Sequence, residues 1–252
     1  MKKLIAANWK MNKNSHEAVS FIKELKNLAG NFDKADVLIC PPFTSIHAAH
    51  EEIKGSGIKL GAQNVYFEES GAFTGEVSAS MLKDEGCEYV IIGHSERREI
   101  FGEIDEFINE KMKTALNQGL KPILCIGETW EERESNQTED VLESQLLKCL
   151  VDIDKIDNIT IAYEPLWAIS KGDPNKKSAT KNDAEDSHRF IREVLSGIYD
   201  ELSARNVRIL YGGSMKPENA KELLEMPNID GGLIGNASLK PESFAKIIES
   251  CP

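Results

Sequence analysis

Hydrophobic residues along this chain fall into two kinds of segment that alternate from one end to the other. The shorter kind is apolar at almost every position, as in Val37-Leu38-Ile39-Cys40 and Tyr89-Val90-Ile91-Ile92. Such unbroken runs are typical of strands that are covered on both faces. Eight of these segments are predicted to be strands: residues 4–8, 36–40, 59–63, 89–93, 122–126, 160–163, 208–211 and 232–234.

The longer kind of segment has helical periodicity. The predicted helices cover residues 15–28, 45–53, 78–85, 105–118, 138–151, 183–203, 217–224 and 241–248. Gly30, Gly86 and Gly119 stand where the first, third and fourth of these helices should end, and Pro217 and Pro241 stand where the last two should begin. Strands that alternate with helices imply a parallel sheet.

Eight such units without a break in composition favour a single (β/α)8 barrel, one catalytic domain over residues 1–252, rather than an open doubly wound sheet. An open sheet would lead us to expect a glycine-rich dinucleotide fingerprint after the first strand. The chain reads Asn8-Trp9-Lys10-Met11-Asn12 there, which disfavours a nicotinamide or flavin cofactor. In a barrel, the chemistry is expected where the strands end and the following loops begin.

Charge narrows the range of ligands. The 252 residues include 30 Lys and Arg against 42 Asp and Glu, a formal charge of −12. Such a field repels polyphosphate backbones, so no nucleic-acid partner is expected. A small anionic substrate would need backbone N–H groups or a well-placed lysine.

The N-terminus and the cysteines bear on location. The first apolar run stops after four residues, too short for a signal peptide or a membrane span. The five cysteines form no C-x-x-C pair and are interpreted as reduced thiols. We therefore expect a cytoplasmic protein without a membrane partner.

Two predicted strand ends carry candidate polar residues. Asn8 and Lys10 flank Trp9, so an extended backbone would point both side chains to one side, although most lysines are simply solvated. The fourth strand is followed by Gly93-His94-Ser95-Glu96-Arg97-Arg98. His94 precedes what looks like the first turn of a helix, whose positive end favours a neutral imidazole that can polarise a carbonyl. The alternative is a histidine that only caps the helix.

Glu164 follows the sixth predicted strand and precedes Pro165. A buried carboxylate at this place should become more basic when water is excluded, which suits a general base. Alternatively, Glu164 pairs with Lys10 or an arginine. Residues 165–181 lack any period and are interpreted as a lid, with Trp167 near its root. Cys125, at the end of the fifth strand, is interpreted as a packed thiol.

Small residues cluster after the last two strands, in Gly212-Gly213-Ser214 and Gly231-Gly232-Leu233-Ile234-Gly235-Asn236. Small side chains let backbone N–H groups approach a phosphate, and these loops are the usual phosphate site of such barrels. No metal site is predicted, because His47-x-x-His50 lies in an ordinary helix without a clear third ligand.

Seven ordered motifs together closely resemble the triosephosphate isomerase family. They are Ala7-Asn8-Trp9-Lys10-Met11-Asn12, Gly61-Ala62-Gln63-Asn64, Gly71-Ala72-Phe73-Thr74-Gly75-Glu76, Gly93-His94-Ser95-Glu96-Arg97-Arg98, Tyr163-Glu164-Pro165-Leu166-Trp167-Ala168-Ile169, Tyr211-Gly212-Gly213-Ser214 and Gly235-Asn236-Ala237-Ser238-Leu239.

The resemblance implies interconversion of dihydroxyacetone phosphate and D-glyceraldehyde 3-phosphate through an enediol(ate), in glycolysis and gluconeogenesis, without a metal or organic cofactor. By the same likeness, Glu164 matches the base and His94 the neutral electrophile. Asn8 and Lys10 match residues that hold the substrate oxygens, and Glu96 matches an acid that orients Lys10 and the surroundings of His94.

The resemblance also implies which residues bind the substrate and its phosphate: Ser170, Gly213, Ser214, Leu233, Gly235 and Asn236. The lid departs from the family pattern, because residues 168–180 are four residues longer and Ser170 replaces a glycine. Asn236 replaces another glycine, and we expect it to keep the backbone N–H in place because asparagine tolerates a positive φ.

Thr74 lies in a loop that, by resemblance, reaches into a neighbouring subunit and braces Lys10 and His94, so a homodimer is expected. Two other functions stay open. One is a different phosphate-binding barrel isomerase, which has no reason to keep His94 and Glu164 in these contexts. The other is a catalytically silent homologue, which the altered lid allows.

Overall fold

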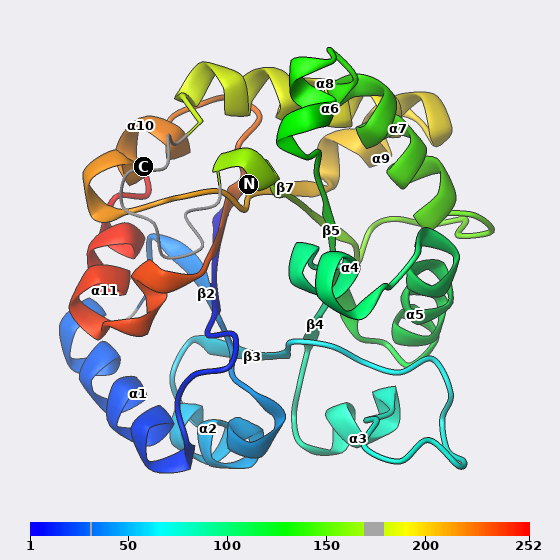
Figure 1. The fold of residues 1–252 in the computed structure, drawn as a ribbon. Helices are drawn as coiled ribbons and strands as arrows, with labels where there is room; N and C mark the ends of the chain where they lie inside the picture. The colour runs from blue at the N-terminus through cyan, green and yellow to red at the C-terminus, as the bar shows by residue number, and fades with distance from the viewer. Residues whose placement is uncertain (31, 169–178) are drawn as a thin grey trace.

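Eight parallel strands form a closed barrel in the computed structural model, which describes residues 1–30, 32–168 and 179–252 (Figure 1). Each strand pairs with the next, and β8 pairs with β1 to close the sheet. The strands are β1 Lys3–Asn8, β2 Ala35–Cys40, β3 Ile58–Ala62, β4 Tyr89–Ile92, β5 Lys121–Ile126, β6 Thr160–Tyr163, β7 Arg208–Tyr211 and β8 Gly231–Ile234. The predicted barrel is confirmed, and the open-sheet alternative is excluded.

Helices surround the barrel as an outer ring (Figure 1). They are α1 Ser15–Ala29, α2 Ile46–Ile53, α3 Ala79–Asp84, α4 Ser95–Phe101, α5 Asp105–Asn117, α6 Trp130–Glu134, α7 Thr138–Cys149, α8 Lys181–Ile198, α9 Glu201–Asn206, α10 Pro217–Leu224 and α11 Pro241–Glu249, with short 3-10 turns η1 Phe43–Ser45, η2 Leu166–Ala168 and η3 Asn236–Leu239. Among these described helices, none is long and apolar enough to cross a bilayer.

Local sequence explains most helix ends. Gly30, Gly86 and Gly119 have φ values of 58°, 82° and 72°, which glycine adopts without the Cβ penalty, and Pro217 and Pro241 are first helical residues, as predicted. The single helix predicted over 183–203 was wrong. It is two helices, because the chain turns after α8 and the Asp200 side chain accepts a hydrogen bond from Ser203 N to begin α9.

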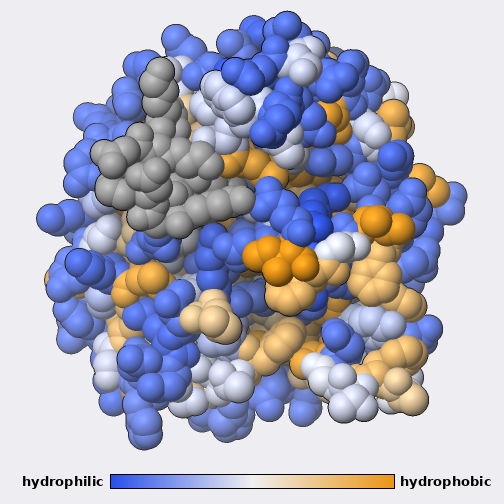
Figure 2. Space-filling view, in the orientation of Figure 1, coloured by the Kyte–Doolittle hydropathy of each residue, from blue (hydrophilic) through white to orange (hydrophobic). Residues whose placement is uncertain are grey.

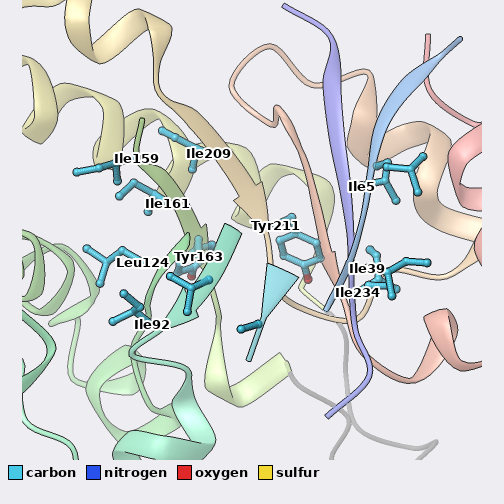
Figure 3. Close-up of a cluster of buried hydrophobic side chains, with 14 of the residues drawn as sticks. Ile5, Ile39, Ile92, Leu124, Ile159, Ile161, Tyr163, Ile209, Tyr211 and Ile234 are labelled. Atoms are coloured by element: carbon cyan, nitrogen blue, oxygen red, sulfur yellow. The ribbon is translucent and has the colours of Figure 1, made fainter. Parts of the chain in front are cut away.

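Side chains alternate between the inside and the outside of the barrel. In β1, Leu4 and Ala6 belong to a small cluster that fills the barrel, whereas Ile5 and Ala7 belong to a large cluster under the helices. Figure 3 shows part of this large cluster, including Tyr163 of β6, at the strand faces that pack against helices. The interior is therefore closed by packing, which leaves the strand ends and their loops to carry chemistry.

Candidate active site

The end of β1 brings Asn8 and Lys10 to the mouth of the barrel. Trp9 between them is fully buried, and its ring lies 5.0 Å from that of Phe21 in the outer core. The backbone is not extended at Lys10 as we expected, because Lys10 has a φ of 52°. The Asn8 side-chain oxygen stabilises this turn by accepting a hydrogen bond from Lys10 N at 3.0 Å.

His94 occupies the N-cap of α4. Its Nδ1 accepts a hydrogen bond from Glu96 N at 3.2 Å, so Nδ1 carries no proton and the neutral ring has its hydrogen on Nε2. The Nε2 atom lies 3.0 Å from Glu164 Oε1. The capping interpretation is confirmed, and the second nitrogen still faces the barrel mouth as a donor, so the electrophile role stays a prediction that the cap does not oppose.

Glu96 connects the residues from β1 with those from β4. Its Oε1 lies 2.7 Å from Lys10 Nζ, and its Oε2 lies 3.7 Å from His94 Nδ1. Both the Lys10 and Glu96 side chains are partly exposed, at 27% and 39%, so this ion pair contributes orientation more than stability. The ammonium group is thereby held beside His94.

Glu164 is almost completely buried at the end of β6, with 3% of its side chain exposed. Its Oε2 accepts a hydrogen bond from Ser95 N at 2.8 Å, while Oε1 faces His94. Glu164 thus pairs with His94, rather than with Lys10 or an arginine as the alternative had it.

The expectation that the pKa of Glu164 is raised does not hold for this arrangement. Burial raises the pKa of Glu164, but its interaction and hydrogen bond with His94, the N–H of Ser95 and the charge of Lys10 together lower it below the usual value. The carboxylate is therefore ionised in the neutral pH range. The protonation state that a general base needs is already present.

Two glycines make room for Glu164. A Cβ at Gly127 would lie 1.8 Å from the Glu164 carbonyl oxygen, and a Cβ at Gly212 would lie 2.8 Å from Glu164 Cγ. Gly212 was part of a predicted phosphate loop, whereas Gly127 was not singled out. The one feature of the sequence that could have indicated Gly127 is its position directly after a predicted strand.

The loop after β7 packs tightly against its own strand. A Cβ at Gly213 would lie 2.3 Å from the Tyr211 hydroxyl oxygen, which leaves room for glycine only. Ser214 follows, and its carbonyl accepts a hydrogen bond from Asn219 Nδ2 at 3.0 Å, which ties the loop to α10. The backbone of Gly213 and Ser214 is thus fixed at the barrel mouth.

The loop after β8 lies beside Lys10, since a Cβ at Gly235 would be 3.5 Å from Lys10 Cε. The Leu233 side chain is buried inside the barrel, so only its main chain is left for a ligand. Asn236 does not have a positive φ, which corrects our reasoning about it. It begins η3 instead, and the first N–H groups of a helical turn lack partners within that turn.

Two expected residues remain to be placed. Ser170 lies outside the described residues. Thr74 is exposed on the long loop between β3 and α3, at the lower right of Figure 1. Among the described residues, the structure brings together Asn8, Lys10, His94, Glu96 and Glu164, with Thr74 of this chain outside the group.

A buried carboxylate beneath the predicted root of the lid was missed. Glu128 is completely buried and accepts hydrogen bonds from Tyr163 Oη at 3.0 Å and Trp167 Nε1 at 2.8 Å. Burial raises the pKa of Glu128. Burial also raises the pKa of the Cys125 thiol inside the barrel, which agrees with the packed and unreactive role predicted for it.

Comparison with known proteins agrees with this geometry. The family model described as Triosephosphate isomerase matches residues 3–251. Curated relatives with that name include one from Dictyoglomus turgidum, 50% identical over 99% of both chains, and one from Carboxydothermus hydrogenoformans, 52% identical over 98% of both. Another, from Aquifex aeolicus, is 49% identical over 99% of this chain and all of its own. The chain therefore belongs to the triosephosphate isomerase family.

Proposed function

We propose that this protein is an aldose–ketose isomerase that interconverts dihydroxyacetone phosphate and D-glyceraldehyde 3-phosphate. The observation that carries the proposal is the buried pair at the barrel mouth, where His94 Nε2 and Glu164 Oε1 lie 3.0 Å apart. An ionised carboxylate and a neutral imidazole that donates from Nε2 are the base and the acid that an enediol intermediate requires.

In the proposed reaction, Glu164 removes a proton from the carbon next to the carbonyl. His94 Nε2 donates a hydrogen bond and then a proton to the carbonyl oxygen, which yields an enediol. Glu164 then gives its proton to the neighbouring carbon, and His94 regains a proton from the hydroxyl on the first carbon. Both side chains end as they began, so no atom is gained or lost. These are proton transfers only, and we propose that they need no metal or organic cofactor.

The base must exchange partners before it can act. In the structure, Glu164 Oε2 accepts the N–H of Ser95 and Oε1 faces His94. A substrate that enters between the two side chains replaces these contacts. The carboxylate of Glu164 can then face the substrate carbon that loses its proton. Loss of the two hydrogen bonds in a buried place raises the pKa of Glu164, so its basicity increases only after substrate is bound.

We propose that Asn8 and Lys10 hold the substrate oxygens. Lys10 adds the positive charge that offsets the enediolate and the phosphate, and its ion pair with Glu96 keeps the ammonium group in place. This local cation matters because the whole chain carries a formal charge of −12, which repels an anionic substrate.

The phosphate is proposed to lie among the backbone N–H groups of Gly213, Ser214, Gly235 and Asn236, with Ser170 completing the site from the lid. Titration with 2-phosphoglycolate tests this, because the compound carries both a phosphate and a carboxylate. Micromolar binding is expected, whereas millimolar or absent binding would contradict the proposed site.

We propose a single catalytic domain that acts as a cytosolic homodimer. Hydrophobic side chains gather around α4 on the face shown in Figure 2, and Ile100 and Phe101 of α4 are exposed. Phe73, in the loop before α3, and Met81 of α3 are exposed as well. Thr74 directly follows Phe73 in the loop that is proposed to reach the partner subunit. All five cysteines are free and buried thiols, which suits a reducing compartment.

A coupled assay of glyceraldehyde 3-phosphate turnover tests the activity. Turnover that is lost when Glu164 is replaced by glutamine supports the isomerase. A folded wild-type protein that binds 2-phosphoglycolate without turnover would instead be the catalytically silent homologue. A protein that neither binds nor turns over these compounds would be a different phosphate-binding barrel.

A further inference from the structure

The loop between β1 and α1 contains two lysines in the left-handed region of backbone space. Lys10 has a φ of 52° and Lys13 a φ of 72°. This region is uncommon for residues other than glycine, asparagine and aspartate, and such conformations persist where surrounding contacts fix them. Here the contacts are visible. Gln63 Nε2 donates to the Lys10 carbonyl at 2.9 Å, and Ser45 Oγ donates to the Lys13 carbonyl at 3.0 Å.

The side chain of Lys13 is held as firmly as its backbone. Its ammonium group lies 4.7 Å from the centre of the Phe21 ring and 5.5 Å from that of Trp9, within the range of cation–π attraction. Its Nζ donates a hydrogen bond to the Leu239 carbonyl at 2.9 Å. Lys13 therefore connects α1 and the barrel mouth to the last residue of η3.

The other end of η3 lies beside Lys10. A Cβ at Gly235, the residue just before η3, would lie 3.5 Å from Lys10 Cε. Within η3, Ser238 Oγ bonds to the carbonyls of Ile234 and Gly235 at 2.8 and 2.7 Å. This short turn is thus held from inside by Ser238 and at its last residue by Lys13, while the residue before it lies beside Lys10 of the same loop.

We propose that Lys13 is a positioning residue for the phosphate group of the substrate. It acts through η3, because its bond to Leu239 fixes the turn whose first N–H groups belong to the proposed phosphate site. Its positive charge at the carbonyl end of η3 also offsets the partial negative charge there. The inference rests on the proposed function, and Lys13 itself contacts neither the reacting carbons nor their oxygens.

The test compares three variants. Lys13→Met keeps the length of the side chain and removes its charge and hydrogen bond, and Lys13→Arg restores both. Lys23→Met is the matched control, since it removes one lysine charge from α1 at a side chain that is 64% exposed and lies 3.9 Å from Glu52. Calorimetric titration with 2-phosphoglycolate and with inorganic phosphate is combined with steady-state kinetics.

We expect Lys13→Met to weaken the binding of both ligands about three- to tenfold, the size typical of one lost ordinary hydrogen bond, because Lys13 acts on the phosphate site only through η3. KM should rise by a similar factor while kcat falls less than KM rises. Lys13→Arg should recover most of the affinity, and Lys23→Met should bind like the wild type. Part of the loss should persist at high salt, because screening removes the charge effect but not the misplacement of η3.

Wild-type affinity in a folded Lys13→Met protein would overturn the inference, and so would an equal loss in Lys23→Met. A fall in kcat without a change in affinity would also overturn it, because that pattern assigns Lys13 to the reacting atoms. Failure of the proposed function gives a different result, in which the wild type itself shows no turnover or 2-phosphoglycolate binding.

Discussion

The bond between His94 Nε2 and Glu164 Oε1 sets the chemistry of this site. The bond needs a hydrogen on Nε2, and the structure puts it there because Nδ1 accepts from Glu96 N and so carries no proton. Position along the chain was enough to single out both side chains, since each follows a buried strand. The direction of the pKa shift of Glu164 could not be predicted, because burial, which raises the pKa, is outweighed by contacts with His94 and with the N–H of Ser95, which is 69 residues away in the sequence.

Replacement of His94 by alanine, which removes the donor, tests the contribution of His94 to the pKa of Glu164. Burial keeps raising the pKa of Glu164 in the variant, whereas the lowering by His94 is lost. The acid limb of kcat/KM for the free enzyme should therefore move to higher pH. We expect kcat to fall about 10²- to 10³-fold, as for the loss of one oxyanion donor. An unmoved acid limb would show that another group is responsible for it.

Replacement of Glu164 by aspartate tests how strongly turnover depends on the distance between the carboxylate and the substrate carbon. The shorter side chain withdraws the carboxylate by about one methylene, and proton transfer depends steeply on distance, so kcat should fall about 10²-fold. The affinity for 2-phosphoglycolate should change little, which serves as the control that the site is intact. Unchanged turnover in the coupled assay would identify a different base.

Helices and strands with a regular hydrophobic pattern were predicted well. Those whose ends depend on one or two capping residues were predicted poorly. All eight strands were found, because their apolar runs reflect burial on both faces. Helix α4 was recognised only as a first turn, since Ser95–Phe101 has one buried residue and little periodicity. The division between α8 and α9 depends on the Asp200 cap, which a periodic pattern does not reveal.

The packing of α8 on the barrel predicts a dependence of stability on pH. His188 is completely buried, and burial lowers its pKa to about 3 from 6.5. Below pH 6.5 the unfolded chain takes up a proton that the folded protein does not, so stability falls toward acid by about 1.4 kcal/mol per pH unit from this group.

His188→Asn keeps a donor for the Asn228 carbonyl, which lies 3.2 Å from His188 Nδ1, and removes the titration. Urea unfolding at pH 7 and pH 5, at one protein concentration, should show that the wild type loses about 2 kcal/mol more than the variant. Equal losses in both proteins would mean that His188 is not the group responsible.

For the whole molecule, the closed barrel could be predicted from the sequence pattern, but the association of subunits could not. The repeat of eight βα units predicted a closed sheet, and β8 does pair with β1. The long loop that carries Thr74 has no helical or strand pattern, and its own chain leaves Thr74 exposed. A partner that covers this loop cannot be derived from the pattern of a single chain, so the homodimer stays a prediction.

Thr74→Arg tests the proposed dimer. A long charged side chain in the proposed interface should separate the subunits, so the variant should scatter light as a particle near 28 kDa, and the wild type as one twice that mass. Activity should fall with dissociation, because Lys10 and His94 would lose the brace proposed to come from the partner. A wild-type protein near 28 kDa that retains full activity would contradict the dimer.

Proton exchange with solvent tests the central claim most directly. In D2O, the wild type should incorporate deuterium at the carbon of dihydroxyacetone phosphate that loses its proton to Glu164, and proton NMR should follow the loss of that signal. Glu164→Gln should abolish the exchange while 2-phosphoglycolate still binds. Undiminished exchange in that variant, or none in the wild type, would contradict the assignment of this carboxylate as the base.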